Sequence, residues 1–480
     1  MNALERLEPS IVWKHFNDIC SIPHISKCES KLVKHIQSLA SQWGLESHVD
    51  EVGNLIVWKP PTNKNSSSIT LQSHLDMVPQ KNETTIHDFE LDPIQPYVDG
   101  NYVKAKGTTL GADNGIGVAV ALAVLESKDL SHGQIEALFT IDEETGMTGA
   151  LGLKPGILKS RKMINLDTEE EGQFYIGCAG GVNCSAELVC AEEQVDKNYI
   201  AFTIALKGLK GGHSGIDVNS GRGNAVKLLN RVLFSGTSLF SLRISKFSGG
   251  TVRNAIPREA FATIIIPETD KQAFISFVGK QEKELINEYA GAEDSIEIKI
   301  TGTDVPASCL SLKSQENLMH MIYACPNGVI RMSSKIPDVV ETSNNLAILD
   351  YQNGKAQVHC LLRSLTGSAI KDLENTLCCT LTLAGAHVEF SGGYPGWEPE
   401  PDSNLLKTMT ETYESITNRK PEVKVVHAGL ECGIIGSKYP DMEIVSCGPT
   451  IQFPHSPDER LEISSVNEFW RYLVKLLEVV

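Results

Sequence analysis

Residues 139–150 read FTIDEETGMTGA, and they decide the fold because an apolar strand ends there in three consecutive acids, Asp142, Glu143 and Glu144. Acids beside an apolar strand are costly unless they are solvated, paired or bound to metal. The turn at Thr145-Gly146 can aim one glutamate at a metal and the other at a substrate; a solvated acidic loop is the alternative. Functional acids at the carboxyl end of a buried strand are typical of an open α/β sheet.

Four further potential ligands occupy similar places. Asp167 ends the predicted strand of MINLDTEEE, and His74 of SHLDMVP directly follows another strand. Asp113 stands where the glycine-rich loop GTTLGADNG enters an apolar helix, and His455 lies on the proline-bounded loop FPHSPDE. Since functional side chains of such sheets collect at the carboxyl ends of the strands, we expect all of these side chains to converge.

Each motif has a simpler reading when it is taken alone. His74 could be a histidine packed at a strand end, and Asp113 could be a helix N-cap. Asp76 lies two residues after His74, so in an extended chain it points to the same side and can support that histidine. We interpret the three glutamates that follow Asp167 as solvated.

Together these residues satisfy two divalent cations that share a bridging carboxylate, Asp113, and a bridging hydroxide. One ion would bind His74 and Asp167 besides the bridges, and the other Glu144 and His455, so each reaches the four ligands usual for zinc. Three carboxylates and one hydroxide balance the charge of two dications. Without metal the carboxylates, with Glu143 among them, repel one another unless some are protonated. The pattern therefore predicts a two-metal hydrolytic site.

Length and composition limit the number of domains, the kinds of partner and the cellular compartment. A chain of 480 residues favours two or more domains, and a net charge of -17 argues against nucleic acid or anionic membrane as a partner. The start MNALERLEPS has no signal-peptide pattern, and the apolar run Ile116 to Leu125 is too short to span a bilayer. The twelve cysteines form no CxxC pair, which indicates reduced thiols and a cytoplasmic location. We interpret the adjacent Cys378 and Cys379 as packing residues.

Strand-like and helix-like segments alternate over residues 1–180 and again over 397–480. This alternation predicts an α/β catalytic domain with a mostly parallel sheet and helices on both faces. His455 lies in the late segment whereas its expected co-ligands precede residue 170, so residues 181–396 must be an insertion. Strands and helices within the insertion predict an α+β lid domain of two small lobes.

The motifs HLDMVP, GADNGIGVA, DEETGMTGA, NLDTEE, GGHSG, HAGLECG and FPHSPDE resemble the signatures of the co-catalytic zinc aminopeptidase-like family. That family contains aminoacylases, acetylornithine deacetylases, tripeptidases and dipeptidases. The resemblance covers essentially the whole chain and implies a zinc-peptidase-like fold. The segments GLKGGHSGIDVNSGRGNA and HAGLECGIIG are most similar to the family's dipeptidases that hydrolyse Xaa-His dipeptides such as carnosine.

The resemblance also implies roles for individual residues. Two zinc ions per subunit, with cobalt or manganese as substitutes, would be bound by His74, Asp113, Glu144, Asp167 and His455. Glu143 would be the general base, and Asp76 would have a supporting catalytic role. In the lid, His213 of GGHSG would stabilise the oxyanion. The further substrate-binding positions would be Asn254 of RNAIP, Arg363 of LLRS and Gly429 of HAGLECG.

We therefore predict a metallopeptidase, a dizinc exopeptidase that hydrolyses dipeptides of broad range with a metal-activated water. Small peptides are the expected partners, without nucleic acid or membrane, and both a monomer and a homodimer through the lid remain open. An N-acyl amino acid deacylase or a tripeptidase with the same metals is the first alternative. A catalytically inert binding protein on the same fold is the second.

Overall fold

The computed structural model describes residues 3–480, which form two compact units. Unit 1 holds the described residues up to Cys178 together with Trp397–Val425 and Leu430–Val480. Unit 2 holds Ala179–Gly396 and the short return Val426–Gly429. The segment Val426–Gly429 lies within residues 397–480, which were expected to belong wholly to the catalytic domain. It belongs to unit 2 because it forms hydrogen bonds there; for example, Ala179 N donates to Val426 O at 3.1 Å.

Unit 1 is built on an eight-stranded sheet. In spatial order the strands are β1 (Glu46–Val49), β2 (Leu55–Lys59), β6 (Ile135–Thr140), β3 (Ile69–His74), β7 (Lys162–Asn165), β23 (Glu443–Ser446), β8 (Gln173–Cys178) and β22 (Glu422–Val426). The central strands β6, β3, β7 and β23 are parallel. Every residue of β3 and β6 is buried, as expected for parallel strands that are covered on both faces.

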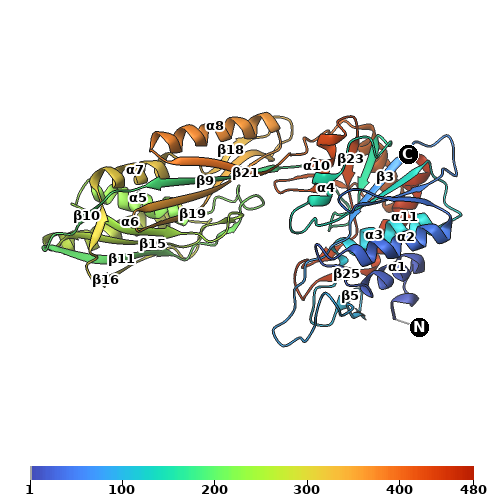
Figure 1. Ribbon diagram of the computed structural model, residues 1–480, viewed down its shortest axis with the longest axis horizontal. Coiled ribbons are helices and arrows are strands. Elements are labelled where there is room, and N and C mark those ends of the chain that lie inside the picture. The colour runs from blue at the N-terminus through green and yellow to red at the C-terminus, as the bar shows by residue number, and fades with distance from the viewer. Residues whose placement is uncertain (1–2) are drawn as a thin grey trace. The chain divides into compact units, whose positions relative to one another are not determined.

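The helices of unit 1 supply that cover. They are η1 (Ala3–Arg6), α1 (Ser10–Cys20), α2 (Ser30–Trp43), α3 (Ala112–Glu126), α4 (Thr148–Gly152), α9 (Asn404–Thr417), α10 (Glu431–Lys438) and α11 (Ile463–Val479). Helix α3 is buried from Ala112 to Leu125 because it packs between α1 and strand β3. Figure 1 shows α1, α2 and α3 gathered on one side of this unit and α4 and α10 on another.

A second, antiparallel sheet of unit 1 carries the loop of FPHSPDE. Its strands are, in order, β24 (Ile451–Gln452), β25 (Arg460–Glu462), β5 (Tyr102–Ala105) and β4 (Pro96–Asp99). The loop therefore connects two paired strands, and both of its ends are fixed by the β24–β25 ladder.

Unit 2 contains one continuous nine-stranded sheet. The strands run β16 (Glu297–Thr303), β11 (Tyr199–Lys207), β15 (Ala260–Pro267), β13 (Arg243–Gly249), β19 (Val340–Gln352), β20 (Lys355–Ser364), β9 (Gly180–Val189) and β21 (His387–Tyr394), with β18 (Gly328–Met332) beside β19. The two expected lobes are the halves of this sheet, joined where Phe247 of β13 pairs with Tyr351 of β19. Two short pairs complete the unit: β10 (Glu192–Gln194) with β17 (Ser308–Leu310), and β12 (Gly212–His213) with β14 (Ala255–Ile256).

The helices of unit 2 are η2 (Glu268–Asp270), α5 (Ala225–Thr237), α6 (Lys271–Glu288), α7 (Leu312–Ala324) and α8 (Gly367–Leu383). The buried stripe of α8 is Ala369, Leu373, Leu377 and Leu381, at the four-residue spacing of one helix face. Cys378 and Cys379 lie off this stripe and are exposed, so the prediction that they pack in the core is wrong. None of the helices in residues 3–480 is long and apolar enough to cross a bilayer.

Candidate metal centre

His74, the last residue of β3, lies at the centre of the first ligand group. Its Nε2 is 3.2 Å from Asp113 Oδ1 and 3.3 Å from Asp167 Oδ1, and Asp167 follows the neighbouring strand β7. Its Nδ1 lies 3.0 Å from the backbone oxygen of Asp76. Because a carbonyl can only accept, Nδ1 carries a proton, and Nε2 is the ring nitrogen that faces the two aspartates.

Asp113 also belongs to a second group. Its other oxygen, Oδ2, is 3.0 Å from His455 Nε2, and the same nitrogen is 3.0 Å from Glu144 Oε1. His455 is half exposed, whereas the carboxylates of Asp113 and Glu144 are almost completely buried. The structure thus brings all five predicted ligands together, with Asp113 shared between two triads.

The donor atoms fit divalent cations. Candidate ligand atoms lie within 4.8 Å of one another in each of three groups: His74 with Asp113 and Asp167, Asp113 with Glu144 and His455, and His74 with Glu143 and Glu144. Two ligands at about 2.0–2.1 Å from a tetrahedral zinc are about 3.3 Å apart, close to the spacings around His74. Nitrogen and oxygen donors at this spacing suit two cations that share Asp113.

The cluster retains protons when no cation balances its charge. Burial, and the nearby carboxylates of Asp167, Glu431 and Glu144, hold the pKa of Glu143 well above its ordinary value. Burial and the neighbouring Asp113 likewise raise the pKa of Asp167 to about 6. These directions agree with the repulsion that the sequence analysis expected.

Glu169 was predicted to be solvated, but the structure places its side chain partly in the interior. It is half-buried, and burial together with Asp113 and Asp167 raises its pKa to about 8. Glu171 is also not free in solvent, because its carboxylate accepts a hydrogen bond from Tyr413 Oη at 2.5 Å. The run of three glutamates looked like a polar loop in the sequence, and only the fold turns two of them inward.

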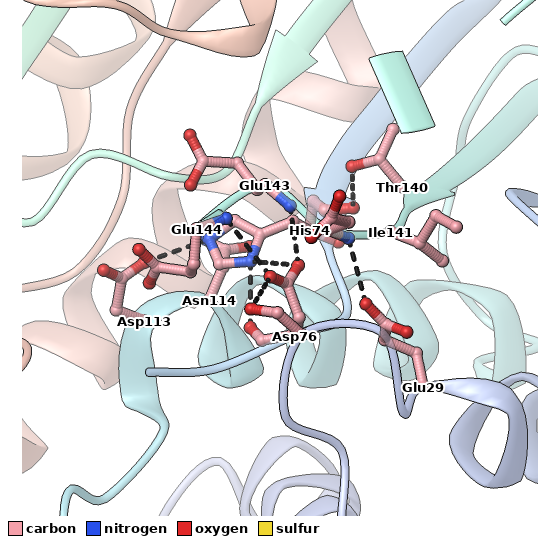
Figure 2. A network of polar contacts seen from close by, with 12 residues as sticks. Glu29, His74, Asp76, Asp113, Asn114, Thr140, Ile141, Glu143 and Glu144 are labelled. Carbon is pink, nitrogen blue, oxygen red and sulfur yellow. Dashed lines mark hydrogen bonds and ion pairs between the residues drawn. The ribbon is translucent and has the colours of Figure 1, made fainter. Parts of the chain in front are cut away.

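Asp76 acts mainly on the turn that carries the two glutamates. Its Oδ1 accepts from Glu143 N at 2.9 Å and its Oδ2 from Glu144 N at 3.1 Å (Figure 2). Ser26 Oγ also donates to Oδ2, at 2.7 Å. Its carboxylate is 3.5 Å from His74 Nδ1, farther than its own backbone oxygen. Although burial opposes its charge, hydrogen bonds from His74, Ser26 and Glu143 lower the pKa of Asp76 to about 2.

Asp142, the first of the three acids, shapes the same turn. Its φ of +57° lies in the left-handed region, and its carboxylate accepts from the hydroxyls of Thr145 and Thr148. The buried Glu29 accepts from Asp142 N at 3.0 Å. Asp142 therefore holds the backbone that presents the two following glutamates to the other candidate ligands.

Asp113 is not a helix cap. The N-cap of α3 is Gly111, which has no side chain to cap with, and Asp113 and Asn114 depart from helical φ and ψ. Asn114 Nδ2 donates to Leu166 O at 2.8 Å and to Asp167 Oδ1 at 2.6 Å. The start of α3 thus orients Asp167 as well as Asp113, a role for Asn114 that the sequence did not reveal.

A buried chain of polar side chains lies across the ends of the ligand-bearing strands. Gln72 Nε2 donates to Glu431 Oε2 at 2.7 Å, and Asn165 Nδ2 donates to Gln72 Oε1 at 2.5 Å. Ser446 Oγ donates to Asn165 and contacts Thr168 Oγ1 at 2.7 Å. We call these five residues the polar belt. It was not predicted, because the residues come from three strands, a helix and a loop and share no sequence pattern.

His213 lies in unit 2 at the end of β12. Its Nδ1 accepts from the backbone amides of Gly215 at 3.2 Å and Ile216 at 3.0 Å. Burial and the nearby Arg363 lower its pKa, so the ring is neutral at pH 7. An accepting Nδ1 leaves the proton on Nε2, which makes that nitrogen a hydrogen-bond donor.

Arg363 lies on β20 of unit 2 and is 4% exposed. Its Nη1 donates to Tyr394 Oη at 3.2 Å, and its Nε is buried without a partner. No carboxylate among residues 3–480 forms an ion pair with it, which removes the structural ion pair as an explanation. A buried guanidinium without an anion is suited to bind a carboxylate from outside the chain.

Gly429 and Asn254 also lie in unit 2. A Cβ on Gly429 would come within 2.8 Å of the Tyr394 ring, so the backbone approaches that side chain closely. Asn254 is exposed, and Asn345 Nδ2 holds its two neighbours by donating to Arg253 O at 3.0 Å and Ala255 O at 2.8 Å. The Asn254 side chain is left available for other contacts.

An open α/β sheet that brings two histidines and two further carboxylates around one shared aspartate has the features of a metallopeptidase domain. The chain belongs to peptidase family M20/M25/M40, whose family model matches residues 70–479.

Two similar proteins extend over the whole chain. Cytosol non-specific dipeptidase of Escherichia coli (strain K12) is 45% identical over 100% of this chain and 99% of its own length. The solved structure of aminoacylhistidine dipeptidase from Vibrio alginolyticus is 46% identical, covers 99% of this chain and 98% of its own, and has a TM-score of 0.95. Aminopeptidase PepT from Bacillus cereus, 15% identical with a TM-score of 0.57 over 98% of both chains, shares the fold.

Proposed function

We propose that this protein is a metal-dependent dipeptidase that hydrolyses a broad range of dipeptides and prefers those with histidine in the second position. The observation that carries the proposal is the sharing of Asp113 between two ligand triads, with Glu143 beside them. The names of the Escherichia coli and Vibrio alginolyticus relatives support dipeptides as the substrate class.

Glu143 is the proposed general base. Two divalent cations bound by the five ligands would supply a water of lowered pKa and a polarised peptide carbonyl. Glu143 takes the proton from the attacking water and returns it to the leaving amine. Asp76 holds the Glu143 and Glu144 amides, so it fixes the direction of the base and of one ligand together.

Residues of unit 2 are proposed to bind the substrate. The Nε2–H of His213 donates to the oxygen on which negative charge develops, because its Nδ1 is already engaged as an acceptor. Arg363 binds the terminal carboxylate of the dipeptide through its planar fork. Asn254 and the backbone of Gly429 provide further polar contacts. Unit 1 then supplies the chemistry, and the inserted residues 181–396 act as the substrate-binding lid.

The metal and the location are proposed as well. Nitrogen and oxygen donors with four ligands per ion favour zinc, and cobalt or manganese have similar requirements. Metal content after purification, measured by mass spectrometry, tests this choice. A cytoplasmic location is supported by the name of the Escherichia coli relative.

A hydrolysis panel tests the function. Purified protein is assayed with Ala-His, a dipeptide without histidine, a tripeptide and an acetyl-amino acid, each with and without chelator, and the products are separated by chromatography. We expect chelator-sensitive cleavage of both dipeptides with the higher kcat/KM for Ala-His. Faster cleavage of the tripeptide or the acetyl-amino acid would instead support the tripeptidase or the deacylase. No cleavage after reconstitution with zinc, cobalt and manganese would support an inert binding protein.

A further inference from the structure

Glu459 gathers four backbone amides at the start of helix α3. Its Oε2 accepts from Leu110 N at 2.7 Å and Gly111 N at 3.1 Å, and its Oε1 accepts from Ala112 N at 2.8 Å and Asp113 N at 3.3 Å. The carboxylate is 2% exposed, and Leu110 and Ala112 are buried beside it. These N–H groups therefore have a carboxylate as acceptor where water has little access.

The start of α3 cannot fix its own backbone. The first N–H groups of a helix have no partner within it, and Gly111 at the N-cap provides no side-chain acceptor. At Asp113 the backbone has φ -83° and ψ 106°, outside the helical range. The directions of these peptide planes depend on an acceptor from elsewhere in the chain, and Glu459 is that acceptor.

Glu459 comes from the loop that carries His455. The histidine lies four residues earlier, with a φ of +59° in the left-handed region, where an L-residue is strained. The loop thus reaches Asp113 twice: His455 Nε2 contacts its Oδ2 at 3.0 Å, and Glu459 accepts from its backbone amide. A carboxylate anchored in this way fixes the loop and the start of α3 to each other.

We propose that Glu459 is a positioning residue that sets the direction of the bridging ligand Asp113 and its distance from His455. The proposal rests on the proposed two-cation site. Glu459 itself faces backbone amides and does not bind a cation. Its effect is to hold Asp113 so that Oδ1 points toward His74 and Oδ2 toward His455, which a bridging carboxylate requires.

The test compares E459Q with E136Q in the full-length protein. Glutamine keeps the size of Glu459, but its NH2 group opposes two of the four amide donors. Glu136 is a matched control: it is fully buried, its carboxylate accepts from Lys159 N and Ser160 N at 3.0 Å, and it lies at the opposite end of β6 from Thr140. Zinc binding is measured by competition with a chromophoric chelator, without substrate.

We expect E459Q to bind at least one zinc ion about 10- to 100-fold more weakly than the wild type, as is usual when a supporting partner of a ligand is lost. E136Q keeps wild-type zinc affinity, and kcat of zinc-saturated E459Q falls with little change in KM. Wild-type affinity in E459Q, or an equal loss in E136Q, would overturn the proposal. A wild-type protein that does not bind two zinc ions would instead overturn the proposed function.

If E459Q does not fold, E459D is measured in the same way. It keeps the carboxylate but is one methylene shorter, so the four amides cannot all reach it without moving the loop. Weakened zinc binding in E459D supports the positioning role. Wild-type zinc binding there overturns it, because the reach of the side chain would then not matter.

Discussion

Glu143 and Glu144 are adjacent, yet the structure separates their tasks. Glu144 Oε1 contacts His455, whereas Glu143 belongs to neither of the two triads that share Asp113. We expect E143A and E143Q to lower kcat by about 10²- to 10⁴-fold, the usual contribution of a general base, and to retain both metal ions. Steady-state kinetics and metal analysis of the same samples check this, and loss of both metals would contradict the assigned role.

Asp76 allows a graded test of the turn. In D76N one oxygen becomes an NH2 group that opposes the amide of Glu143 or Glu144, so we expect kcat to fall about 10- to 100-fold and zinc binding to weaken. S26A removes only the hydroxyl that donates to Asp76, so its kcat and its zinc binding should fall less than those of D76N. Equal kinetics for D76N and the wild type would show that the turn keeps its position without this carboxylate.

Arg363 should recognise the free carboxylate of the substrate. The wild type is expected to cleave Ala-His at least about 10-fold more efficiently than its C-terminal amide, since a charge-assisted bidentate pair is lost with the amide. R363M should lower kcat/KM for Ala-His and abolish this preference. A variant that still discriminates against the amide would assign carboxylate recognition to another residue.

At the residue scale, the sequence predicted which side chains meet at the strand ends. It did not predict the residues that orient those side chains through hydrogen bonds. His74 and Asp167 directly follow predicted strands, so their convergence follows from parallel-sheet geometry. Glu459 and Asn114 could not be found in this way, because each acts on backbone or side chains of a different loop. Their partners are set by tertiary packing, which leaves no periodic signal.

The polar belt is the element-scale device that ties the strands together. Q72L would remove the acceptor of Asn165 Nδ2 and one of the two donors to Glu431 Oε2, which keeps Thr140 Oγ1. We therefore expect a loss of about 1–3 kcal/mol in unfolding free energy, the cost of one unsatisfied buried group. Urea unfolding of metal-free protein measures it. Q42L on the exposed face of α2 is the control and should change stability by about 0.5 kcal/mol or less. Equal stability of the two variants would contradict a structural role for the belt.

Elements with a clear period were the most predictable. The apolar spacing within residues 30–43 and within residues 271–288 predicts a helix over each segment, and the structure has α2 and α6 there. The hairpin of β19 and β20 was missed, although Asn353-Gly354 between them is a tight-turn signal with both φ values positive. Polar residues on these long strands masked the alternation. Such strands are recognised by their turn and not by apolar residues.

At the scale of the whole molecule, stability depends on how the buried carboxylates are neutralised. In the metal-free protein the pKa of Asp167 is raised to about 6 and that of Glu431 to about 7, chiefly by burial. In the unfolded chain both titrate near their ordinary values of about 4. Between about pH 4 and 7 these two carboxyl groups therefore bind more protons in the folded protein than in the unfolded chain, so their contribution to the unfolding free energy falls as pH rises.

His74 and His455 have raised pKa values, so their contributions to the unfolding free energy also fall as pH rises above 6.5. Asp76 has a lowered pKa, and its stabilising contribution is constant above about pH 4. Bound cations would have the opposite effect on the pH dependence of stability. Each ligand must lose its proton to bind a cation, so the affinity for the cation grows as pH rises. We expect the difference in Tm between zinc-loaded and metal-free protein to widen from pH 5 to pH 8. Differential scanning fluorimetry measures this difference. The control is D113N, which lacks the carboxylate shared by the two triads, and its difference in Tm should stay small at every pH. A difference that stays constant or narrows would mean that the ligand carboxylates do not bind cations in competition with protons.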